Sequence, residues 1–232
     1  MRLFRREQYL KKIRPFYDDD LIKVITGIRR CGKSCLMATI VEELKERGVP
    51  EKDIVYLDLD KRGNRSIKTP DQLEAAIESR LVDDDFKYLF IDEVQNVRGY
   101  EEVVNAFNTD GGFSIFITGS NSYLLSGELM TKLTGRYVEF EMFTLSFSEF
   151  LAMKKFLGVE RKDDRAEFEE YLRYGGFPRS LEYDDVEAKA HYVEDVVKQI
   201  IKKDIRSRNK IRNIEAFERV MTYVINNYGA PT

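Results

Sequence analysis

Up to residue 145, short apolar runs alternate with longer runs that space their apolar residues helically. The short runs are rich in β-branched and aromatic residues and predict strands, at 21–26, 53–59, 88–91, 113–118 and 137–143. The longer runs predict helices, at 5–16, 34–47, 71–81, 100–107 and 124–133. This alternation of strands and helices indicates an α/β fold.

The character of the sequence changes after Leu145. Only runs with helical spacing follow, at 146–157, 164–174, 186–206 and 215–226. We therefore expect a core domain over 1–145 and a small helical domain over 146–232. The segment Gly175 to Pro178 interrupts the helices, and its two glycines and proline fit either a simple turn or a hinge.

The eight residues from Gly27 to Ser34 read G-x-x-x-x-G-K-S and directly follow the first predicted strand. This is the pattern of a phosphate-binding loop, whose glycines let backbone N–H groups turn inward onto a polyphosphate. Lys33 is placed to reach the β- and γ-phosphates and Ser34 to bind Mg²⁺, while the next helix directs its positive end at the anion. The expected nucleotide contacts come from one segment: Gly27, Ile28, Arg29, Arg30, Cys31, Gly32, Lys33, Ser34 and Cys35. The alternative is a glycine-rich turn that binds no nucleotide.

Two adjacent carboxylates, Asp92 and Glu93, follow the apolar run 88–91. That run suits a strand buried on both faces, which puts the acids at its carboxyl end, where open α/β sheets bind ligands. Asp92 then suits an outer-shell role toward the Mg²⁺ that Ser34 binds, and Glu93 is placed to orient and deprotonate an attacking water. The alternative is a solvated acidic pair, which is common after a strand.

Small polar residues and one arginine complete the candidate site. Ser120 and Asn121 follow the fourth predicted strand, where either can bond a γ-phosphate or the water, although both also suit a helix cap. Arg136 precedes the fifth predicted strand and is a candidate γ-phosphate contact, in its own chain or in a neighbouring subunit. A surface arginine is the alternative reading of Arg136.

Charge and cysteine content narrow the class of protein. A formal net charge of -3 over 232 residues gives no global case for nucleic acid, so such a contact requires a local patch. The densest basic run, over 202–212, fits either a solvated helix face or such a patch. The basic residues of the helix at 5–16, Arg6 among them, are expected to form a solvated face over a packed apolar one; the alternative is that this helix flanks the adenine.

The two cysteines, Cys31 and Cys35, lack partners for a disulfide framework or a zinc site. The sequence shows no apolar run of membrane-spanning length and no apolar signal core. We therefore expect a soluble cytoplasmic protein without an integral membrane segment. A turn signal at 228–232 closes the sequence, and we expect that this is not the natural terminus.

With these motifs assembled, the chain resembles the P-loop ATPases of the AAA type. Among them it resembles an archaeal and bacterial family in which the ATPase precedes a C-terminal domain of unknown function. The resemblance rests on GIRRCGKS at 27–34, YLFIDEVQ at 88–95, FITGSNS at 116–122, LTGRYVEFEMFTLSFSEFL at 133–151 and YGGFP at 174–178. It implies a three-layer P-loop NTPase fold with a five-stranded parallel sheet, in which one strand is inserted between the Walker A and Walker B strands. It also implies a truncated winged-helix segment and a C-terminal domain that is absent here.

The resemblance makes ATP the expected nucleotide and Mg²⁺ its metal. The leading hypothesis is Mg-dependent ATP hydrolysis that couples the nucleotide state to movement of the helical domain. The alternative is a nucleotide-controlled switch, or a DNA- or protein-binding module, with little intrinsic turnover. A small-molecule kinase is less favoured, because the Asp92–Glu93 pair suits water as the acceptor. A homo-oligomer is possible, and a DNA or protein partner is expected mainly through the missing C-terminal part.

Overall fold

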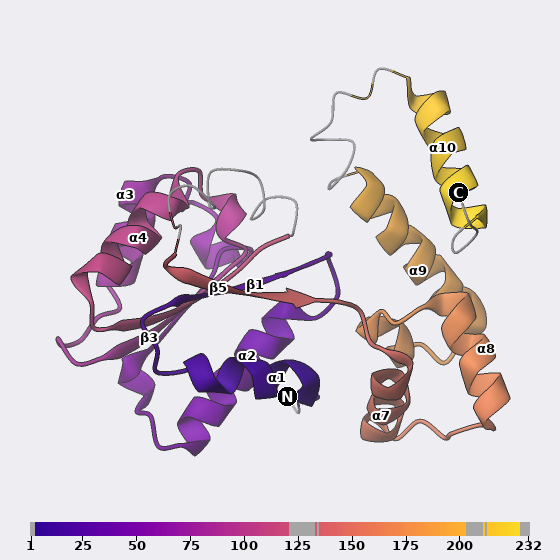
Figure 1. Ribbon diagram of the computed structural model, residues 1–232, viewed down its shortest axis with the longest axis horizontal. Helices are drawn as coiled ribbons and strands as arrows, with labels where there is room; N and C mark the ends of the chain where they lie inside the picture. The colour runs from indigo at the N-terminus through magenta and orange to yellow at the C-terminus, as the bar shows by residue number, and fades with distance from the viewer. Residues whose placement is uncertain (1–2, 121–132, 134, 203–210, 212, 228–232) are drawn as a thin grey trace. The chain divides into compact units, whose positions relative to one another are not determined.

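The computed structural model describes residues 3–120, 133, 135–202, 211 and 213–227 (Figure 1). The chain forms two compact units, residues 1–193 and 194–232. Asn121, most of the helix expected at 124–133 and most of the basic run over 202–212 lie outside the described residues. The expected domain boundary at 145/146 stays a prediction.

The centre of the first unit is a five-stranded parallel sheet. Its strands lie in the order β2 (Ile54–Asp58), β3 (Lys87–Asp92), β4 (Phe113–Thr118), β1 (Ile22–Gly27) and β5 (Tyr137–Met142). The order places β4 between β1, which carries the G-x-x-x-x-G-K-S loop, and β3, which carries the two carboxylates. The predicted α/β class and the inserted strand are therefore confirmed.

Helices cover both faces of the sheet (Figure 1). On one face lie α3 (Pro70–Glu78) and α4 (Tyr100–Asp110), and on the other lie α1 (Glu7–Ile13) and α2 (Lys33–Glu46). Side chains of β3 alternate between these layers: Leu89 and Ile91 pack with α3 and α4, whereas Phe90 packs with α1 and α2. All of β3 is buried, which is why its sequence is continuously apolar from Tyr88 to Ile91.

Aromatic rings extend across three strands beneath α2. The Phe90 and Phe116 rings stack with their centroids 4.6 Å apart, and Tyr56 stacks on the other side of Phe90 at 5.9 Å. Tyr17 meets the Phe116 ring edge-on at 6.1 Å. These offset and edge-on contacts bury a large apolar area and fix the strand register beneath the candidate site.

Two strands carry fully buried lysines that point their ammonium groups to the amino-terminal edge of the sheet. Lys23 of β1 donates to the Asp19 carbonyl at 2.8 Å and to Ser114 Oγ at 2.7 Å, and burial lowers its pKa to about 8. Lys87 of β3 pairs with Asp53 at 2.6 Å and also contacts Asp83. Two charged side chains are thus buried at strand positions where the sequence pattern predicts apolar residues.

The rest of the first unit is helical, with α7 (Phe147–Leu157), α8 (Asp164–Tyr174) and the start of α9 (Val186–Ile200). A buried ion pair between Lys154 and Glu167, at 2.5 Å, joins α7 to α8. Gly176 lies so close to Leu145 that an added Cβ would stand 2.1 Å from the Leu145 carbonyl oxygen. The break predicted at Gly175–Pro178 is confirmed, and it is followed by the short helix η5 (Pro178–Glu182).

The second unit contains the last residues of α9 and the helix α10 (Ile214–Asn226). The remaining short helices are η1 (Arg14–Phe16), η2 (Glu51–Asp53), η3 (Arg62–Asn64) and η4 (Val94–Asn96). The helix expected at 5–16 is realised as α1 and η1, with Tyr9, Leu10 and Ile13 packed as expected. One part of that expectation is wrong: the Arg6 side chain is buried rather than solvated.

Candidate active site

The carboxyl ends of four parallel strands meet at one edge of the sheet and carry the candidate site. Gly27 ends β1, Asp92 ends β3, Thr118 ends β4 and Met142 ends β5. The register pairs Gly27 with Met142 and Ile25 with Thr118, so these ends are level with one another. Open α/β sheets bind ligands at this edge.

The phosphate loop requires its glycines. Gly27 has φ of 150°, and a Cβ built there would lie 2.3 Å from the Met142 carbonyl oxygen. Gly32 has φ of 107°, and a Cβ there would lie 4.0 Å from Pro178 Cγ, so η5 packs beside the loop. Arg30, in the middle of the loop, also has a left-handed backbone, with φ of 67°. Positive φ values of this kind turn successive N–H groups to one side of the chain.

The loop leads into the N-terminus of α2, which no side chain caps. Its first turn contains no acidic residue, so its N–H groups and positive dipole end are available to an anion. The buried Lys33 ammonium donates to the Gly27 carbonyl at 3.0 Å and to the Ile28 carbonyl at 3.4 Å. Ser34, the next residue, is exposed at this end of the helix.

Asp92 is held in place by its neighbours in the sheet. The Thr118 hydroxyl donates to Asp92 Oδ1 and accepts from the Glu93 N–H at 3.0 Å. The Tyr56 hydroxyl lies 3.4 Å from Asp92 Oδ2. One threonine therefore fixes both the aspartate carboxylate and the backbone that presents Glu93. Thr118 is the last residue of the strand that precedes the predicted candidates Ser120 and Asn121, and its contact with both acids follows only from the strand order.

Glu93 follows β3 with a left-handed backbone, φ 59°, which is uncommon for a residue with a side chain. Its side chain is only 15% exposed, and Oε1 lies 3.9 Å from Lys33 Nζ. Gln95 donates to the other carboxylate oxygen. Burial raises the pKa of Glu93, although the Lys33 charge lowers it. A carboxyl group with a raised pKa, next to the loop lysine, is suited to accept a proton.

Of the two remaining predicted site residues that the structure describes, Ser120 and Arg136, one lies at this edge. Ser120 is buried two residues after the end of β4. Arg136 precedes β5, and its carbonyl accepts from the Ile22 N–H at the start of β1. The phosphate loop follows the other end of β1, about 17 Å away along the strand. The Arg136 guanidinium instead donates to Asn105 at 2.6 Å and Thr109 at 3.0 Å, so the geometry excludes the contact within one chain that the sequence suggested.

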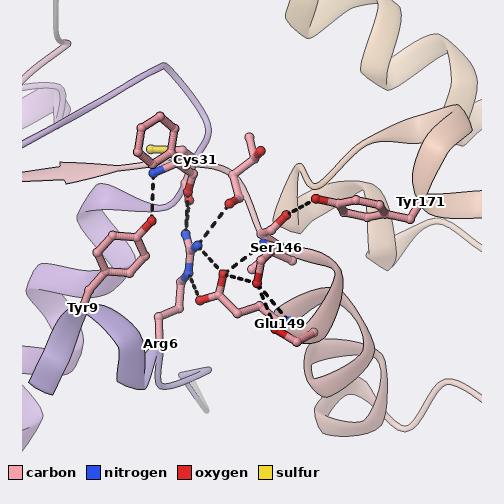
Figure 2. Close-up of polar contacts among 10 residues, drawn as sticks. Arg6, Tyr9, Cys31, Ser146, Glu149 and Tyr171 are labelled. Carbon is pink, nitrogen blue, oxygen red and sulfur yellow. Dashed lines mark hydrogen bonds and ion pairs between the residues drawn. The ribbon is translucent and has the colours of Figure 1, made fainter. Parts of the chain in front are cut away.

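A buried arginine that the sequence did not single out holds the phosphate loop to the helical region (Figure 2). Arg6 pairs with Glu149 through two hydrogen bonds, from Nε at 2.8 Å and from Nη2 at 2.7 Å. Its Nη1 donates to the carbonyl of Cys31, inside the loop, at 3.1 Å and to that of Phe143 at 2.8 Å. Its Nη2 also reaches the Thr144 carbonyl at 3.2 Å. A single side chain thus contacts the phosphate loop, the segment after β5 and α7.

The partner of this arginine also caps α7. The Glu149 carboxylate accepts from the Ser146 N–H at 3.0 Å, and the Ser146 hydroxyl accepts from the Glu149 N–H at 3.3 Å, which is a capping box. Tyr9 adds a second tie from α1, because its hydroxyl accepts from the Phe143 N–H at 3.0 Å (Figure 2). No local sequence signal marks this cluster, since Arg6 and Glu149 are 143 residues apart.

The groups at the carboxyl edge of the sheet fit a nucleoside triphosphate with a divalent cation. The uncapped start of α2 and the Lys33 ammonium supply donors and positive charge for phosphates. The Ser34 hydroxyl and the Asp92 carboxylate are oxygen ligands of the kind that Mg²⁺ prefers. Ser34 and Asp92 therefore stay the residues predicted to hold the metal.

Two family models match the chain. A family model described as an AAA domain matches residues 19–151. A second model, described as a domain of unknown function (DUF8612), matches residues 165–232. The second match corrects the expectation that a C-terminal domain of unknown function is absent from this chain. None of the described helices combines the length and apolar character that a membrane crossing needs, and the expected cytoplasmic location stays a prediction.

Relatives of the chain are longer than the chain itself. An uncharacterized protein of Haemophilus influenzae is 36% identical over 228 residues, which cover 98% of this chain and 56% of that protein. An uncharacterized protein of Methanocaldococcus jannaschii is 34% identical over 212 residues, 88% of this chain and 46% of that protein. The chain therefore spans about half the length of the curated relatives it matches.

Solved structures share the fold at low sequence identity. A Walker-type ATPase of Pyrococcus abyssi superposes with a TM-score of 0.61 at 18% identity, covering 96% of this chain and 78% of that one. A RuvB variant of Thermotoga maritima gives a TM-score of 0.51 at 20% identity, covering 95% of this chain and 70% of that one. These likenesses support the P-loop NTPase fold.

Proposed function

The chain belongs to the AAA domain family, and on that premise we propose that it binds Mg-ATP at the loop 27–34 and hydrolyses it. The observation that carries the proposal is the convergence of Lys33, Asp92 and Glu93 at one sheet edge. Lys33 Nζ and Glu93 Oε1 are 3.9 Å apart, and Asp92 is fixed beside them by Thr118. A cation that can bind phosphate (Lys33), a carboxylate for the metal (Asp92) and a base (Glu93) are thus adjacent.

Binding rests on the loop. Lys33 exchanges its contacts with the Gly27 and Ile28 carbonyls for phosphate oxygens, and the first N–H groups of α2 receive the same anion. Ser34 and Asp92 would hold the cation, which would supply positive charge to offset that of the phosphates. Tyr56 and Thr118 keep the Asp92 carboxylate oriented while it does so.

Glu93 acts as the base that orients and deprotonates the attacking water. Its raised pKa makes the carboxylate more basic than an exposed glutamate, which favours proton transfer near neutral pH. Gln95 holds the second carboxylate oxygen and so restricts rotation of the side chain. Phosphoryl transfer requires little covalent chemistry from the protein, so positioning and charge neutralisation account for most of the catalysis.

Ser120 and Asn121 remain our candidates for sensing the γ-phosphate, and Arg136 remains one only as a residue acting on a neighbouring subunit. That last role requires a homo-oligomer. Mixing Arg136→Ala with Glu93→Gln protein tests it, because each variant supplies what the other lacks. Activity that exceeds the sum of the two variants supports the shared site, and simple addition at every ratio rejects it.

We further propose that nucleotide state is passed to the helical region through Arg6 and η5. Arg6 holds the Cys31 carbonyl and Glu149 of α7 at once, and Pro178 stands beside Gly32. A shift of the loop on nucleotide exchange therefore acts on both elements directly. The same contacts fit the second candidate function, a nucleotide-controlled switch with little turnover. The switch would use the same ATP site as the ATPase but hydrolyse ATP more slowly.

Equilibrium binding tests the site assignment. We expect Lys33→Ala to lose measurable Mg-ATP affinity, and Glu93→Gln to keep wild-type affinity while losing hydrolysis by about 10² to 10⁴-fold. Glu74→Gln, at an exposed position on α3, is the matched control and should change neither. Wild-type affinity in Lys33→Ala would show that ATP binds elsewhere.

A further inference from the structure

A second charged surface lies at the same sheet edge, beyond the Mg²⁺ ligands. The segment 59–69 between β2 and α3 carries four basic residues, and the turn before α4 adds one more: Lys61, Arg62, Arg65, Lys68 and Arg98. All five side chains are exposed. We call these five residues the basic edge. Strand β2 stands three positions from β1, so the basic edge is about 14 Å from the phosphate-loop strand.

The backbone under the basic edge is well anchored. Ile67 is buried in the core with α3 and α4. The Asn64 amide donates to the Asp58 carbonyl at 2.7 Å, and the Arg98 N–H donates to the Lys68 carbonyl at 3.3 Å. The two basic segments are therefore tied together, which lowers the conformational entropy lost when they bind a partner.

Among the residues that the structure describes, these cations have few carboxylate partners. Within the described part of the chain, Arg62, Arg65, Lys68 and Arg98 have no carboxylate within 4 Å, and Lys61 has only Asp58, at 4.0 Å. Lys52 of the same unit, by comparison, contacts Asp83 at 2.6 Å and Asp85 at 3.0 Å.

An open hollow of about 460 Å³ lies among these groups. It is lined by Leu59, Asp60, Arg65, Lys68 and Asn96. Its one carboxylate, Asp60, already accepts from the Asn96 amide at 2.8 Å. Asp60 keeps its negative charge in that contact, but Arg65 and Lys68 outnumber it. The net charge of the lining is therefore positive, and an anionic group is the ligand that complements it.

The residue types on the basic edge indicate whether its anionic partner is a protein or a nucleic acid. None of the large hydrophobic side chains exposed in the described residues lies in 59–69 or 94–99. A protein partner is bound mainly through buried aromatic and aliphatic anchors, which this surface lacks. Several exposed cations on an anchored backbone, with neighbouring amide groups, match a chain of phosphates instead. We propose that the basic edge binds the phosphate backbone of nucleic acid.

The basic edge is also joined to the candidate ATP site. The Leu59 N–H, at the start of the loop, donates to the Asp92 carbonyl at 3.1 Å. A shift of the Asp92 backbone is therefore passed to the loop. The binding proposal does not depend on hydrolysis, so it stands or falls separately from the proposed ATPase activity.

The test is fluorescence anisotropy of the full chain with a labelled single-stranded oligonucleotide and its duplex, across a range of salt concentrations. The variant is Arg65→Gln with Lys68→Gln. We expect it to flatten the slope of log K against log salt by about 1.8 on duplex, or 1.4 on a single strand, for two lost phosphate contacts. That corresponds to roughly 60-fold weaker duplex binding at about 0.1 M salt, if the affinities converge at 1 M.

The matched control is Lys11→Gln with Lys12→Gln, which removes the same charge from exposed positions on α1. If both double variants weakened oligonucleotide binding equally, the proposal would be overturned, because the oligonucleotide would then respond only to the net charge of the protein. Absence of wild-type binding at low salt would also overturn it. Competition by polyglutamate as strong as by unlabelled oligonucleotide would assign the surface to acidic protein segments, and displacement by Mg-ATP would place the oligonucleotide in the phosphate loop. Unchanged thermal midpoints in both variants confirm that folding is intact.

Discussion

Removing the Arg6 side chain is the sharpest test of how the phosphate loop is held. Arg6 is 6% exposed and Glu149 13% exposed, so neither charge of this pair is well solvated. In Arg6→Met the carboxylate keeps its Ser146 N–H bond at 3.0 Å but loses its cation. Removing one partner of a buried pair costs about 3 to 5 kcal/mol. For a unit of this size, that lowers the thermal midpoint by about 6 to 20 °C.

The assay is urea or thermal unfolding of Arg6→Met, Glu149→Met and the double variant. Because the two side chains share two hydrogen bonds, we expect a coupling energy of about 1 to 3 kcal/mol. Arg5→Gln is the control, since Arg5 is 39% exposed and its pairing with Glu46 is worth about 0 to 1 kcal/mol. Equal destabilisation by Arg5→Gln and Arg6→Met would refute the reasoning, as would additive effects at Arg6 and Glu149.

The pH dependence of the same variant provides an internal check. Burial alone would raise the pKa of Glu149, but the Arg6 hydrogen bonds hold it below its ordinary value. A carboxyl whose pKa is lowered by folding stabilises the protein above its unfolded pKa and loses that effect as pH falls through the folded value. The difference between wild type and Arg6→Met should therefore shrink in acid. A difference that stays constant down to the acid transition would contradict the ion-pair explanation.

Three further predictions concern the site itself. Gly27→Ala should abolish Mg-ATP binding in a filter-binding or calorimetric assay, because its Cβ would stand 2.3 Å from the Met142 carbonyl oxygen; wild-type affinity would refute the loop geometry. Thr118→Val should lower the ATP turnover number more than the ATP affinity, because Thr118 orients both Asp92 and the Glu93 backbone; unchanged turnover would remove that role. Glu93→Gln should raise the thermal midpoint at about pH 8 but not at about pH 4, because burial raises the pKa of Glu93 and its ionised form is unfavourable only above that pKa. An equal gain at both pH values would show that charge is not the cause.

The sequence was sufficient to predict the sheet and the edge that carries the site. In a chain that alternates strands and helices, an apolar run such as the one before Asp92 is interpreted as a strand of a parallel sheet that is covered on both faces. The G-x-x-x-x-G-K-S spacing then marks which sheet edge holds the phosphate. The strand order came from the family resemblance rather than from the pattern, because periodicity does not say which strands are neighbours.

The pattern of apolar and polar residues could not predict contacts between side chains that are far apart in the sequence. Arg6 looks like one more surface cation of an amphipathic helix until Glu149 is brought beside it by the fold. Lys23 and Lys87 are buried in strands because their long side chains reach polar groups at the sheet edge, which no local rule indicates. Arg136 is a different case. Residues before a parallel strand lie at the opposite edge from those after one, so its position relative to the loop follows from the strand direction alone.

The central claim is that this chain hydrolyses ATP at the loop 27–34 with Glu93 as the base. Phosphate release by wild type, Glu93→Gln and Lys33→Ala, measured against protein concentration in Mg-ATP, tests it most directly. We predict release by wild type that exceeds both variants, while Glu93→Gln still binds Mg-ATP with wild-type affinity. Wild-type release no faster than that of Glu93→Gln, with ATP bound tightly by both, would contradict the claim and favour the nucleotide-controlled switch.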